Sequence, residues 1–560
     1  MYRWRSTKDN EEVYGKNMMD KENIDRPTVS GIPQKAYYTQ GDISCDSKQR
    51  AEENPGEYPF TRGIFPQGYR KQPWMESLAS GYGLPEETNQ REKYLVKVGQ
   101  AGYAGRASIN LVFDRPTFCG MDSDHPMAKS EVGVVGVIID SLMDMERLFK
   151  DFPLDRLNVG FIADRSGPII MAMYLALAEK LGIPWDQLRG IVCNNPLTDF
   201  YCSKTPMFPP QDSLRLMVDC IKFCTERVPN FNVARIGGYN TRELGSSAVQ
   251  EVGFNLALAR TIVKAGVEEG LKVDEFAGNI SFQFSQGSYF FEEIAKIRAA
   301  RRIWAKILKE EFKAERDNTC RMKIHMQTAG SSLTAQEPLN NIARIALQVL
   351  SAALSGCQSM HIASFDEALG IPTEEAARVA IKTSKILMHE TGITDVADPL
   401  GGSYYVESLT DAIETRSIEI IQQIDEHGGA LKAIEEGFFE QEIANASYLL
   451  EKEFSRGKRV IVGVNRYREQ DRRKDYKVFR PDPEVSRIAI DRIKKLKEGR
   501  NQQLAQKWLH RVREAARNHE PLMPIYIEAA KADVTLGEMI GALEDVLGRF
   551  QYSPIVASSP

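Results

Sequence analysis

The sequence predicts an α/β fold, a (β/α)8 TIM barrel that carries an N-terminal arm and a C-terminal helical extension. The first observation is an alternation between about residues 98 and 400, where short apolar or β-branched runs are each followed by a stretch with helical periodicity. The second is the number of these runs, which is eight. The third is that polar residues follow a buried run at its carboxyl end, where α/β barrels keep their active sites.

Residues 1–60 form the predicted arm. They are polar and rich in charge, and Pro27, Pro33 and Pro55 interrupt them. A segment of this kind buries too little apolar surface to fold alone, so we expect it to order against a larger body. The barrel is then expected to occupy residues 61–405.

Eight segments of the barrel region have the character of strands. They cover residues 107–113, 133–139, 157–163, 188–193, 232–236, 280–284, 321–326 and 358–363. The segments between them show helical spacing, as Ile294, Ile297, Trp304 and Leu308 do. Eight βα units in sequence indicate a closed barrel. A doubly wound open sheet could also hold eight strands, and periodicity alone does not exclude it.

The pattern changes after residue 405, where long helices are expected. Residues 406–455 show amphipathic helical periodicity, and residues 466–500 are strongly charged. Charge runs of this kind are typical of solvated helix faces, and a docking surface for a partner subunit is the alternative. We therefore assign residues 406–560 to a C-terminal helical region.

The composition argues against several classes of function. A net charge of −5 is small for 560 residues, so it gives no reason to expect nucleic acid or a membrane surface as the main partner. No apolar run approaches the ~20 residues that span a bilayer, and the N-terminus lacks the apolar core of a secretion signal. Eight cysteines without a CxxC pair indicate reduced thiols, a cytoplasmic protein and no metal site.

Two polar features stand at or near the ends of predicted strands. The strand 107–113 runs into the string FDRPTFCGMDSDHP at 113–126, in which Asp122 and Asp124 could simply cap a helix. His325 and Gln327 flank a methionine and should therefore point to the same side of their strand. Burying such a pair inside a barrel is costly unless it has a partner or a ligand. A hydrogen-bonded core histidine is the alternative.

Four strings together resemble a known family. They are FDRPT…DSDHP at 113–126, KIHMQTAG at 323–330, QSMH at 358–361, and residues 518–538. They resemble the large, substrate-binding subunit of the adenosylcobalamin-dependent acyl-CoA mutases, and the match covers roughly residues 60–545. The resemblance implies a radical 1,2-rearrangement, in which the cofactor supplies the radical that removes hydrogen from the substrate. The barrel would position the substrate and exclude water.

The resemblance also implies where the cofactor binds. The cofactor-facing positions of the family fall on Phe113, Val135, Glu243, Gly330, Glu367 and Ala368. Glu243 and Glu367 would accept hydrogen bonds from ribose hydroxyls. At Gly330 a side chain would block the close approach of the corrin ring.

The cobalt ligand of the family is a histidine in an Asp-x-His-x-x-Gly motif on a separate flavodoxin-like domain. The nearest string here is DEHGGA at 425–430, where alanine replaces the glycine, and it is interpreted as a helix terminus. The histidine that ligates cobalt is therefore expected on a small cobalamin-binding subunit, as in the two-subunit isobutyryl-CoA and 2-hydroxyisobutyryl-CoA mutases. The resemblance also implies a heterotetramer, with a G-protein chaperone as a further candidate partner.

Four substrate-facing positions depart from the family pattern. A tyrosine is replaced by Ala79, a histidine by Asn240, a glutamine by Cys193 and an arginine by Ser203. Alanine enlarges the pocket, asparagine cannot act as an acid near neutral pH, and serine cannot form a bidentate pair with a carboxylate. Methylmalonyl-CoA is therefore not the expected substrate. The candidate catalytic residues are Asn240, Tyr239, Cys193 and Ser203, with Asn240 orienting the migrating group.

The positions that bind CoA in the family are also altered. Its basic and hydroxyl residues fall on Gln72, Met75, Ser77 and Asn279. Fewer cations should weaken the binding of phosphates, and Arg70, Lys71 and Arg106, the last in an apparent insertion at 103–108, are candidates to compensate. The substrate-binding residues expected from the resemblance are Phe65, Gln72, Ala79, Ser281, His325, Gln327 and Gln358.

Two functions remain open from the sequence. The first is a mutase subunit that rearranges an acyl-CoA, or a related carboxylic acid, other than methylmalonyl-CoA. The second is a barrel that has lost catalysis and serves as a scaffold or regulatory partner of a cobalamin-binding chain. The presence of His325, Gln327, Glu243 and Glu367 favours the first, because a scaffold has no need of them.

Overall fold

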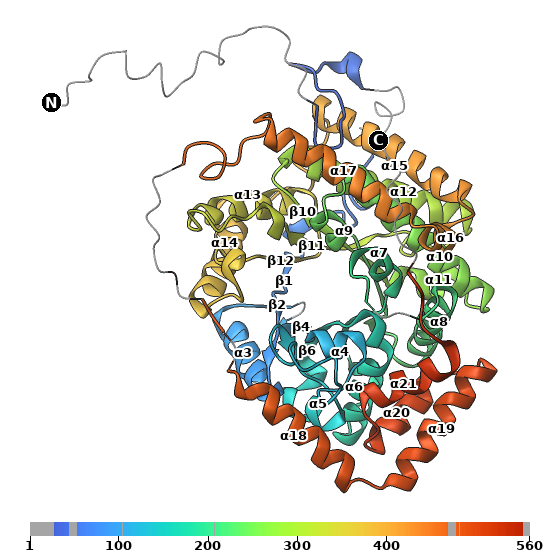
Figure 1. Cartoon of the computed structure of the whole chain (residues 1–560). Helices are drawn as coiled ribbons and strands as arrows, with labels where there is room; N and C mark the ends of the chain where they lie inside the picture. Colours follow the sequence, from blue (N-terminus) through green and yellow to red (C-terminus); the bar gives the residue numbers. More distant parts are fainter. Residues whose placement is uncertain are drawn as a thin grey trace, which may run out of the picture.

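The computed structural model describes residues 27–43, 53–102, 105–205, 208–468, 476, 478–480 and 482–552. Within these residues, parallel strands alternate with helices, which confirms the predicted α/β barrel class (Figure 1). No helix in these ranges combines the length and the apolar character that crossing a membrane requires.

Ten short strands make up two parallel sheets of five strands each. The first contains, in spatial order, β1 (Met75–Glu76), β12 (Ser359–His361), β11 (Lys323–Thr328), β10 (Ile280–Gln286) and β9 (Ala234–Gly237). The second contains β2 (Ala79–Ser80), β4 (Ala107–Val112), β6 (Leu157–Ile162), β7 (Gly190–Cys193) and β8 (Phe231–Asn232).

Two extended segments join these sheets into a ring of eight strands. β1 and β2 are pieces of the segment 75–80, which pairs with β12 through Met75 and with β4 through Ala79. β8 and β9 are pieces of the segment 231–237, which pairs with β7 and with β10. The labels β10, β11, β12, β1, β2, β4 and β6 follow one another along this arc in Figure 1.

One predicted barrel strand was wrong, and one was missed. Residues 133–139 supply only β5 (Gly136–Val137), which pairs with β3 (Tyr82–Gly83) outside the two large sheets. Gly133 and Gly136 have φ of +68° and +93°, so the β-branched run cannot stay extended. The ring instead begins at residues 75–80, whose sequence MESLAS lacks the β-branched residues that mark a strand.

Helices cover the outside of the ring (Figure 1). Around the barrel they are α3 (Pro85–Val98), α4 (Arg115–Cys119), α5 (Leu142–Leu148), α6 (Gly167–Lys180), α7 (Asp199–Cys202), α8 (Pro210–Arg227), α9 (Tyr239–Glu243), α10 (Ala248–Glu268), α11 (Val273–Phe276), α12 (Phe290–Lys306), α13 (Asn340–Leu354) and α14 (Glu374–Glu390). After the barrel come α15 (Tyr404–Glu426), α16 (Ala430–Glu435), α17 (Phe438–Ser455), α18 (Glu484–Gly499), α19 (Gln502–Asn518), α20 (Met523–Lys531) and α21 (Leu536–Leu547).

The described part of the predicted arm lies against the helical layer. The backbone amides of Val29 and Ser30 donate to the carboxylate of Glu292 on α12, and Arg416 of α15 donates to the Ser30 carbonyl. Further along, the buried guanidinium of Arg301 donates to the carbonyls of residues 60, 61 and 355. Residues 1–26 and 44–52 of the arm lie outside the described residues.

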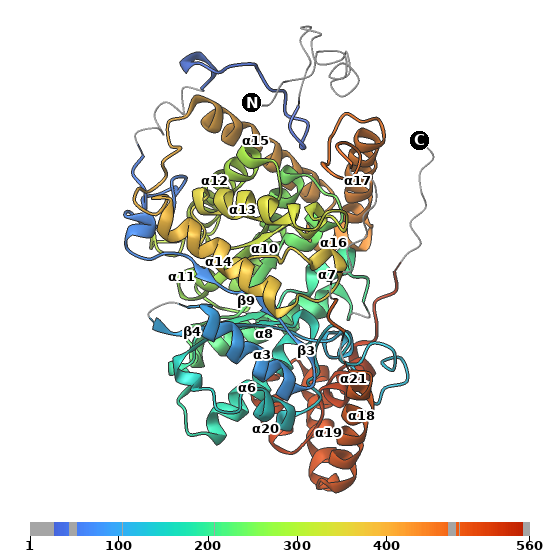
Figure 2. The same ribbon diagram turned by 90° about the vertical axis from the view of Figure 1, so that its left-hand side faces the viewer.

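The C-terminal helices follow the expected pattern. The helices predicted for residues 406–455 are present as α15, α16 and α17, and His427 ends α15, as the interpretation of residues 425–430 as a helix terminus predicts. Helices α18 to α21 gather on one side of the barrel, where α20 packs along α6 (Figures 1 and 2). α6 is buried on nearly all faces because it lies between the ring and α20. Residues 469–475, 477 and 481 of the charged stretch lie outside the described residues.

Candidate active site

A large cavity of about 970 Å³ lies among the amino-terminal ends of the ring strands. Its size is at the upper end of the range for small-molecule sites. Five of the predicted substrate-binding residues line it: Phe65, Gln72, Ser281, His325 and Gln358. Ala79 and Gln327 lie beyond it, nearer the carboxyl ends of their strands.

The lining of this cavity carries an excess of positive charge. Six basic side chains face two acidic ones, and the basic set is Arg106, Arg189, Arg235, Arg316, Arg321 and Lys323. Asp274, one of the two acids, already accepts hydrogen bonds from the backbone of residues 315 and 316 and from Thr319. Burial lowers the pKa of Lys323 to about 8, and its ammonium group donates to the side-chain amide oxygens of Asn232 and Asn279. The cavity therefore suits a polyanionic ligand.

Of the three basic residues predicted to compensate for the missing CoA-binding cations, one lines this cavity. Arg106 lines it, and its guanidinium also donates to the Asp155 carbonyl. Arg70 and Lys71 are exposed and do not line it. Residues 103 and 104 of the predicted insertion lie outside the described residues. The basic residues at 189, 235, 316 and 321 were missed, because none stands in a motif. Lys323 opens the string KIHMQTAG, but the sequence analysis did not single it out.

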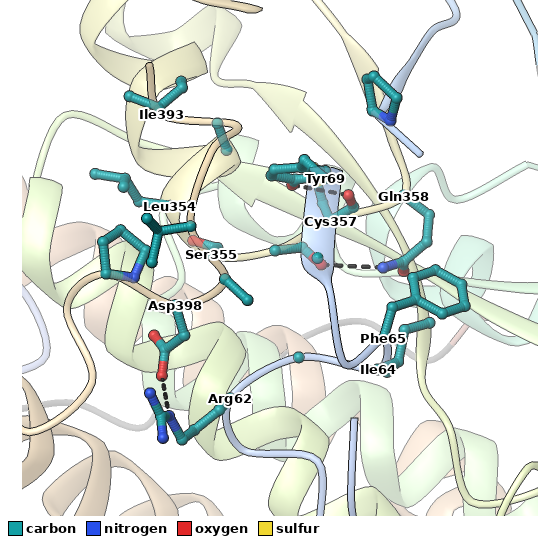
Figure 3. A pocket seen from close by; sticks show the side chains of 18 of the residues that line it. Arg62, Ile64, Phe65, Tyr69, Leu354, Ser355, Cys357, Gln358, Ile393 and Asp398 are labelled. Atoms are coloured by element: carbon teal, nitrogen blue, oxygen red, sulfur yellow. Dashed lines mark hydrogen bonds and ion pairs between the residues drawn. The ribbon is translucent and has the colours of Figure 1, made fainter. Parts of the chain in front are cut away.

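A small cavity of about 40 Å³ adjoins the large one and shares Phe65, Gln72 and Gln358 with it (Figure 3). It lies between the segment 62–73 and the end of α13. An ion pair between Arg62 and Asp398 (2.9 Å) holds one side of this segment, and the Tyr69 hydroxyl donates to the Cys357 carbonyl on the other. These contacts fix the segment that carries Phe65 and Gln72 against the barrel.

The polar residues of β11 are held by neighbours on adjacent strands. The Nδ1 atom of His325 lies 2.7 Å from the Ser359 hydroxyl of β12. Burial, and then the nearby Arg235 charge, hold the pKa of His325 well below its usual value, so the imidazole is neutral. The Oε1 atom of Gln327 accepts from Gln283 of β10 (2.6 Å). The hydrogen-bonded histidine that was the alternative is thus present, and the ring lines the cavity as well.

Four predicted residues meet at the carboxyl ends of the strands. Glu243, at the end of α9, accepts from the amide (2.6 Å) and the hydroxyl (3.1 Å) of Ser331. The Gly330 amide donates to the Tyr239 hydroxyl. A Cβ atom at Gly330 would lie 3.0 Å from Glu367 Oε1, 3.2 Å from the Tyr239 hydroxyl and 3.3 Å from Glu243 Oε2. The structure therefore brings Tyr239, Glu243, Gly330 and Glu367 together.

Burial controls the charge of this cluster. It raises the pKa of Glu367 to about 7, and the nearby Glu243 carboxylate contributes in the same direction. It also raises the pKa values of Glu243 and of the Tyr239 hydroxyl. Near neutral pH the Glu367 carboxyl group can therefore both accept and donate hydrogen bonds, as the hydroxyls of a ribose require.

The other predicted cofactor-facing residues divide into two groups. Val135 is 59% exposed and Ala368 is also exposed, so both are available to a ligand on this side of the barrel. Phe113 is only 3% exposed, and its ring stacks on Phe161 in the core. The structure therefore does not bring Phe113 together with the exposed pair.

The four divergent positions lie in different surroundings. Burial raises the pKa of the Cys193 thiol to about 12, so the thiol stays protonated. The Ser203 hydroxyl donates to Asp199 (2.9 Å). Asn240 is exposed, and its side chain makes no hydrogen bond within the described residues. The Ala79 amide donates to His361 Nδ1 (2.7 Å), and its side chain lines a separate cavity of about 130 Å³.

Two acidic residues near Cys193 were missed by the sequence reasoning. Burial raises the pKa of Asp199 to about 7. Burial and the Asp199 charge together raise the pKa of Asp164 well above its usual value. Asp164 directly follows the strand β6, so its place at a strand end was the available signal. Asp199 accepts from the Ser203 hydroxyl, at the position where the family pattern has an arginine.

The motif at 113–126 has a structural role that favours the capping alternative. Asp114 accepts from the amides of Thr117, at the start of α4, and of Gly133. Asp122 accepts from the Gly537 amide (2.7 Å) and the Thr535 hydroxyl (2.6 Å) at the start of α21. The motif thus joins the carboxyl end of β4 to the C-terminal helices.

Comparisons with known proteins agree with this geometry. The family model described as methylmalonyl-CoA mutase matches residues 27–549. The chain is 38% identical over 529 residues to the 2-hydroxyisobutanoyl-CoA mutase large subunit of Aquincola tertiaricarbonis, covering 94% of this chain and 93% of that one. It is 37% identical over 533 residues to the methylmalonyl-CoA mutase of Rhizobium meliloti, covering 95% and 74%. The chain therefore belongs to the methylmalonyl-CoA mutase family, whose members are isomerases.

Proposed function

We propose that this chain is the substrate-binding large subunit of an adenosylcobalamin-dependent carbon-skeleton mutase that acts on an acyl-CoA other than methylmalonyl-CoA. The observation that carries the proposal is the arrangement along the barrel. A large basic cavity lies at the amino ends of the strands, and the cluster of Tyr239, Glu243, Gly330 and Glu367 lies at their carboxyl ends. A long thioester with phosphates at one end and a reacting acyl group at the other matches this polarity.

The cavity supports the CoA part of the proposal. CoA carries phosphates, which pair best with arginine and lysine in partly buried sites. The neutral residues at Gln72, Met75 and Asn279 stand beside Arg106, Arg321 and Lys323 in the same lining. We infer that Arg106, Arg321 and Lys323 supply the positive charge that the family pattern places at positions 72, 75 and 279.

The exclusion of methylmalonyl-CoA rests on Ser203 and its partner. The Ser203 hydroxyl donates to Asp199. Asp164 lies close enough to Asp199 for the Asp199 charge to raise the pKa of Asp164. A second carboxylate on the acyl group would meet the Ser203 hydroxyl, which is already bound to Asp199, where the family pattern has a guanidinium that can pair with it. The guanidinium of Arg115 lies nearby, but it donates to the Ser203 carbonyl. We therefore infer an acyl group without the malonyl carboxylate at this position.

The carboxyl-end cluster fits an adenosyl group. Glu243 and Glu367 offer acceptors for ribose hydroxyls, and the absence of a side chain at Gly330 leaves their shared space open. When bound, adenosylcobalamin supplies the radical that removes hydrogen from the substrate. The chain itself would orient the acyl group through Asn240 and keep water from the barrel interior.

We further propose that a small cobalamin-binding subunit docks at this end of the barrel and supplies the cobalt-ligating histidine. Exposed apolar side chains at Met127, Val134 and Val135 follow β4 and flank β5 on this side. Exposed apolar groups of this kind mark protein interfaces when they cluster. The heterotetramer, the G-protein chaperone and the cytoplasmic location stay predictions.

The test is reconstitution of the full chain with a small cobalamin-binding subunit and adenosylcobalamin, followed by a screen of acyl-CoA thioesters and free acids. We expect a substrate-dependent change in the absorbance and electron paramagnetic resonance of the cofactor with at least one thioester. A response to free acids alone would contradict the CoA part. No response to any compound, despite a stable complex, would favour the scaffold alternative.

A further inference from the structure

A second cavity adjoins the barrel at the carboxyl end of the segment 75–80. Its volume is about 130 Å³, and it lies between α3, α14 and the ends of β2 and β12. Most of its wall is apolar, formed by Leu78, Leu95, Val112, Ile362, Ile371 and Ala377. A dry cavity of about 150 Å³ accepts benzene, so this one has room for an acyl chain of about five or six carbons.

This cavity continues the line of the large one. Ser77 and Ser359 line the large cavity, and Ala79 and His361 line the second. Side chains two residues apart on a strand face the same side, about 6.6 Å further along. A ligand that passes the serines in the barrel therefore meets Ala79 and His361 next.

The residue at this junction is small. Ala79 leaves space at the edge of the second cavity that the aromatic side chain of the family pattern would fill. His361 stands opposite and accepts the Ala79 amide proton at Nδ1. Burial lowers the pKa of His361 to about 4, so its imidazole is neutral near neutral pH.

Arg91 of α3 supplies the only guanidinium in the lining of this cavity, as the described residues show it. The residue is 8% exposed, and its guanidinium makes one hydrogen bond, from Nη2 to the Pro372 carbonyl (3.2 Å), and lies over the Tyr94 ring, 5.9 Å from its centre. No carboxylate of the described residues forms an ion pair with it. The carboxyl group of the adjacent Glu92 forms no ion pair with Arg91 within the described residues, and burial raises its pKa well above the usual value, although the Arg91 charge acts in the opposite direction.

Other buried arginines of this chain are satisfied in one of two ways: Arg301 donates to three backbone carbonyls, and others pair with carboxylates. Arg298 pairs with Asp398 and Glu407, and Arg302 pairs with Asp411 and Glu414. Burying a guanidinium without such a partner is costly, so an unpaired one beside an apolar cavity indicates an anionic ligand.

We propose that this cavity binds the distal part of the acyl group, so that an acyl chain of about six carbons, with its thioester carbonyl in the barrel, ends in a carboxylate paired with Arg91. The inference rests on the proposed function, because it places the thioester in the barrel. Arg91 is then the residue that sets the specificity for the end of the chain. Glu367 lies at the edge of the cavity, and burial raises its pKa to about 7. Because its carboxyl group is therefore partly protonated near neutral pH, its repulsion of the ligand carboxylate is reduced.

The experiment compares two thioesters of equal chain length by titration calorimetry on the full chain: adipoyl-CoA, which ends in a carboxylate, and hexanoyl-CoA, which ends in a methyl group. We expect the wild-type chain to bind adipoyl-CoA at least about tenfold more tightly. Arg91→Met should remove the preference without weakening hexanoyl-CoA, and Arg91→Lys should keep part of it. Lys93→Met is the matched control, because exposed Lys93 lies on the same helix and pairs with Asp151 at the surface.

The wild-type comparison needs no variant, so it decides the question even if Arg91→Met does not fold. Equal affinity for the two thioesters, or a preference that survives in a folded Arg91→Met protein, would overturn the inference and leave the proposed function intact. Failure of both thioesters and of CoA itself to bind would overturn the proposed function, and this inference with it. Ala377→Phe, which fills the cavity from α14, should weaken both six-carbon thioesters and leave acetyl-CoA unchanged.

Discussion

Glu367 shows how burial sets the protonation state of one side chain and couples it to stability. Its pKa is raised from 4.5 to about 7, because the carboxyl group is buried and lies near Glu243. The folded protein therefore binds a proton more tightly than the unfolded chain does. Stability is unaffected below the unfolded pKa, falls as the pH rises from about 4.5 to 7, and stays reduced above it.

We predict that Glu367→Gln stabilises the protein at pH 8 but not at pH 4.5. The shift corresponds to about 3 kcal/mol at most, and a neutral amide removes the cost of ionising the buried group. Denaturation midpoints of both proteins at the two pH values measure this difference. An equal difference at both pH values would show that packing, and not ionisation, is responsible.

Asn240 carries the second prediction at this scale. Its side chain is exposed and makes no hydrogen bond within the described residues, so its amide is available to a substrate carbonyl. Asn240→Ala should lower kcat/KM by about a hundredfold, as the loss of one oriented donor does, and leave adenosylcobalamin affinity unchanged. Steady-state kinetics and cofactor titration of the reconstituted enzyme measure the two effects. Unchanged turnover would remove Asn240 from the reaction.

Individual residues differed in how far the sequence revealed their surroundings. Tyr239, Glu243, Gly330 and Glu367 were named from motifs, and they converge because motif residues follow strand ends that meet at one end of the barrel. Arg91 could not be found this way. It lies on a helix outside the ring. Whether a carboxylate pairs with it depends on the three-dimensional positions of residues that are distant in the sequence.

At the scale of elements, the helix α9 is positioned by buried charges. Arg242 of α9 donates to Glu293 (2.9 Å), and Lys296 binds both Glu293 and Glu251. The other oxygen of Glu251 accepts from the Ser285 amide of β10. The network therefore ties α9, with Asn240 and Glu243, to α10, α12 and the ring.

We predict that Lys296→Met destabilises the protein by about 3–5 kcal/mol, because two buried carboxylates lose their shared cation. Chemical denaturation measures the loss. Lys309→Met is the control, since this half-exposed lysine pairs with an exposed aspartate and should change stability by less than about 1 kcal/mol. Partial recovery in a Lys296→Met, Glu251→Gln double variant would confirm that the cost is electrostatic; no recovery would point to lost packing.

Elements with a plain apolar pattern were predicted well. The strands β4, β6, β10 and β11 lie within or close to their expected ranges, because each alternates or runs apolar over six or seven residues. The segment 75–80 was missed because it is split into two pairs of residues that belong to different sheets. Such a division is set by the neighbours of a strand and leaves no periodicity in its own sequence.

At the scale of the whole molecule, the motif at 113–126 connects the barrel to the C-terminal helices. Besides its bonds to Thr535 and Gly537, Asp122 pairs with Lys497 of α18 at 3.0 Å. Lys497 also binds Asp124, and Arg500 at the end of α18 binds Glu538 of α21. The resemblance identified this string as a family marker, but its partners lie about 400 residues away, which local pattern cannot show.

This connection predicts that the C-terminal helices loosen as a unit when Asp122 is removed. Asp122→Ala leaves the Gly537 amide, the Thr535 hydroxyl and the Lys497 ammonium without their shared acceptor, at a cost of about 3 kcal/mol. Hydrogen exchange should accelerate over α18 to α21 more than over the barrel strands, because the lost bonds all lie between these two parts. Asp124→Asn, which touches only Lys497 of this group, should have a much smaller effect. Uniform acceleration across the ring would mean that Asp122 stabilises the barrel itself and not its junction with the C-terminal helices.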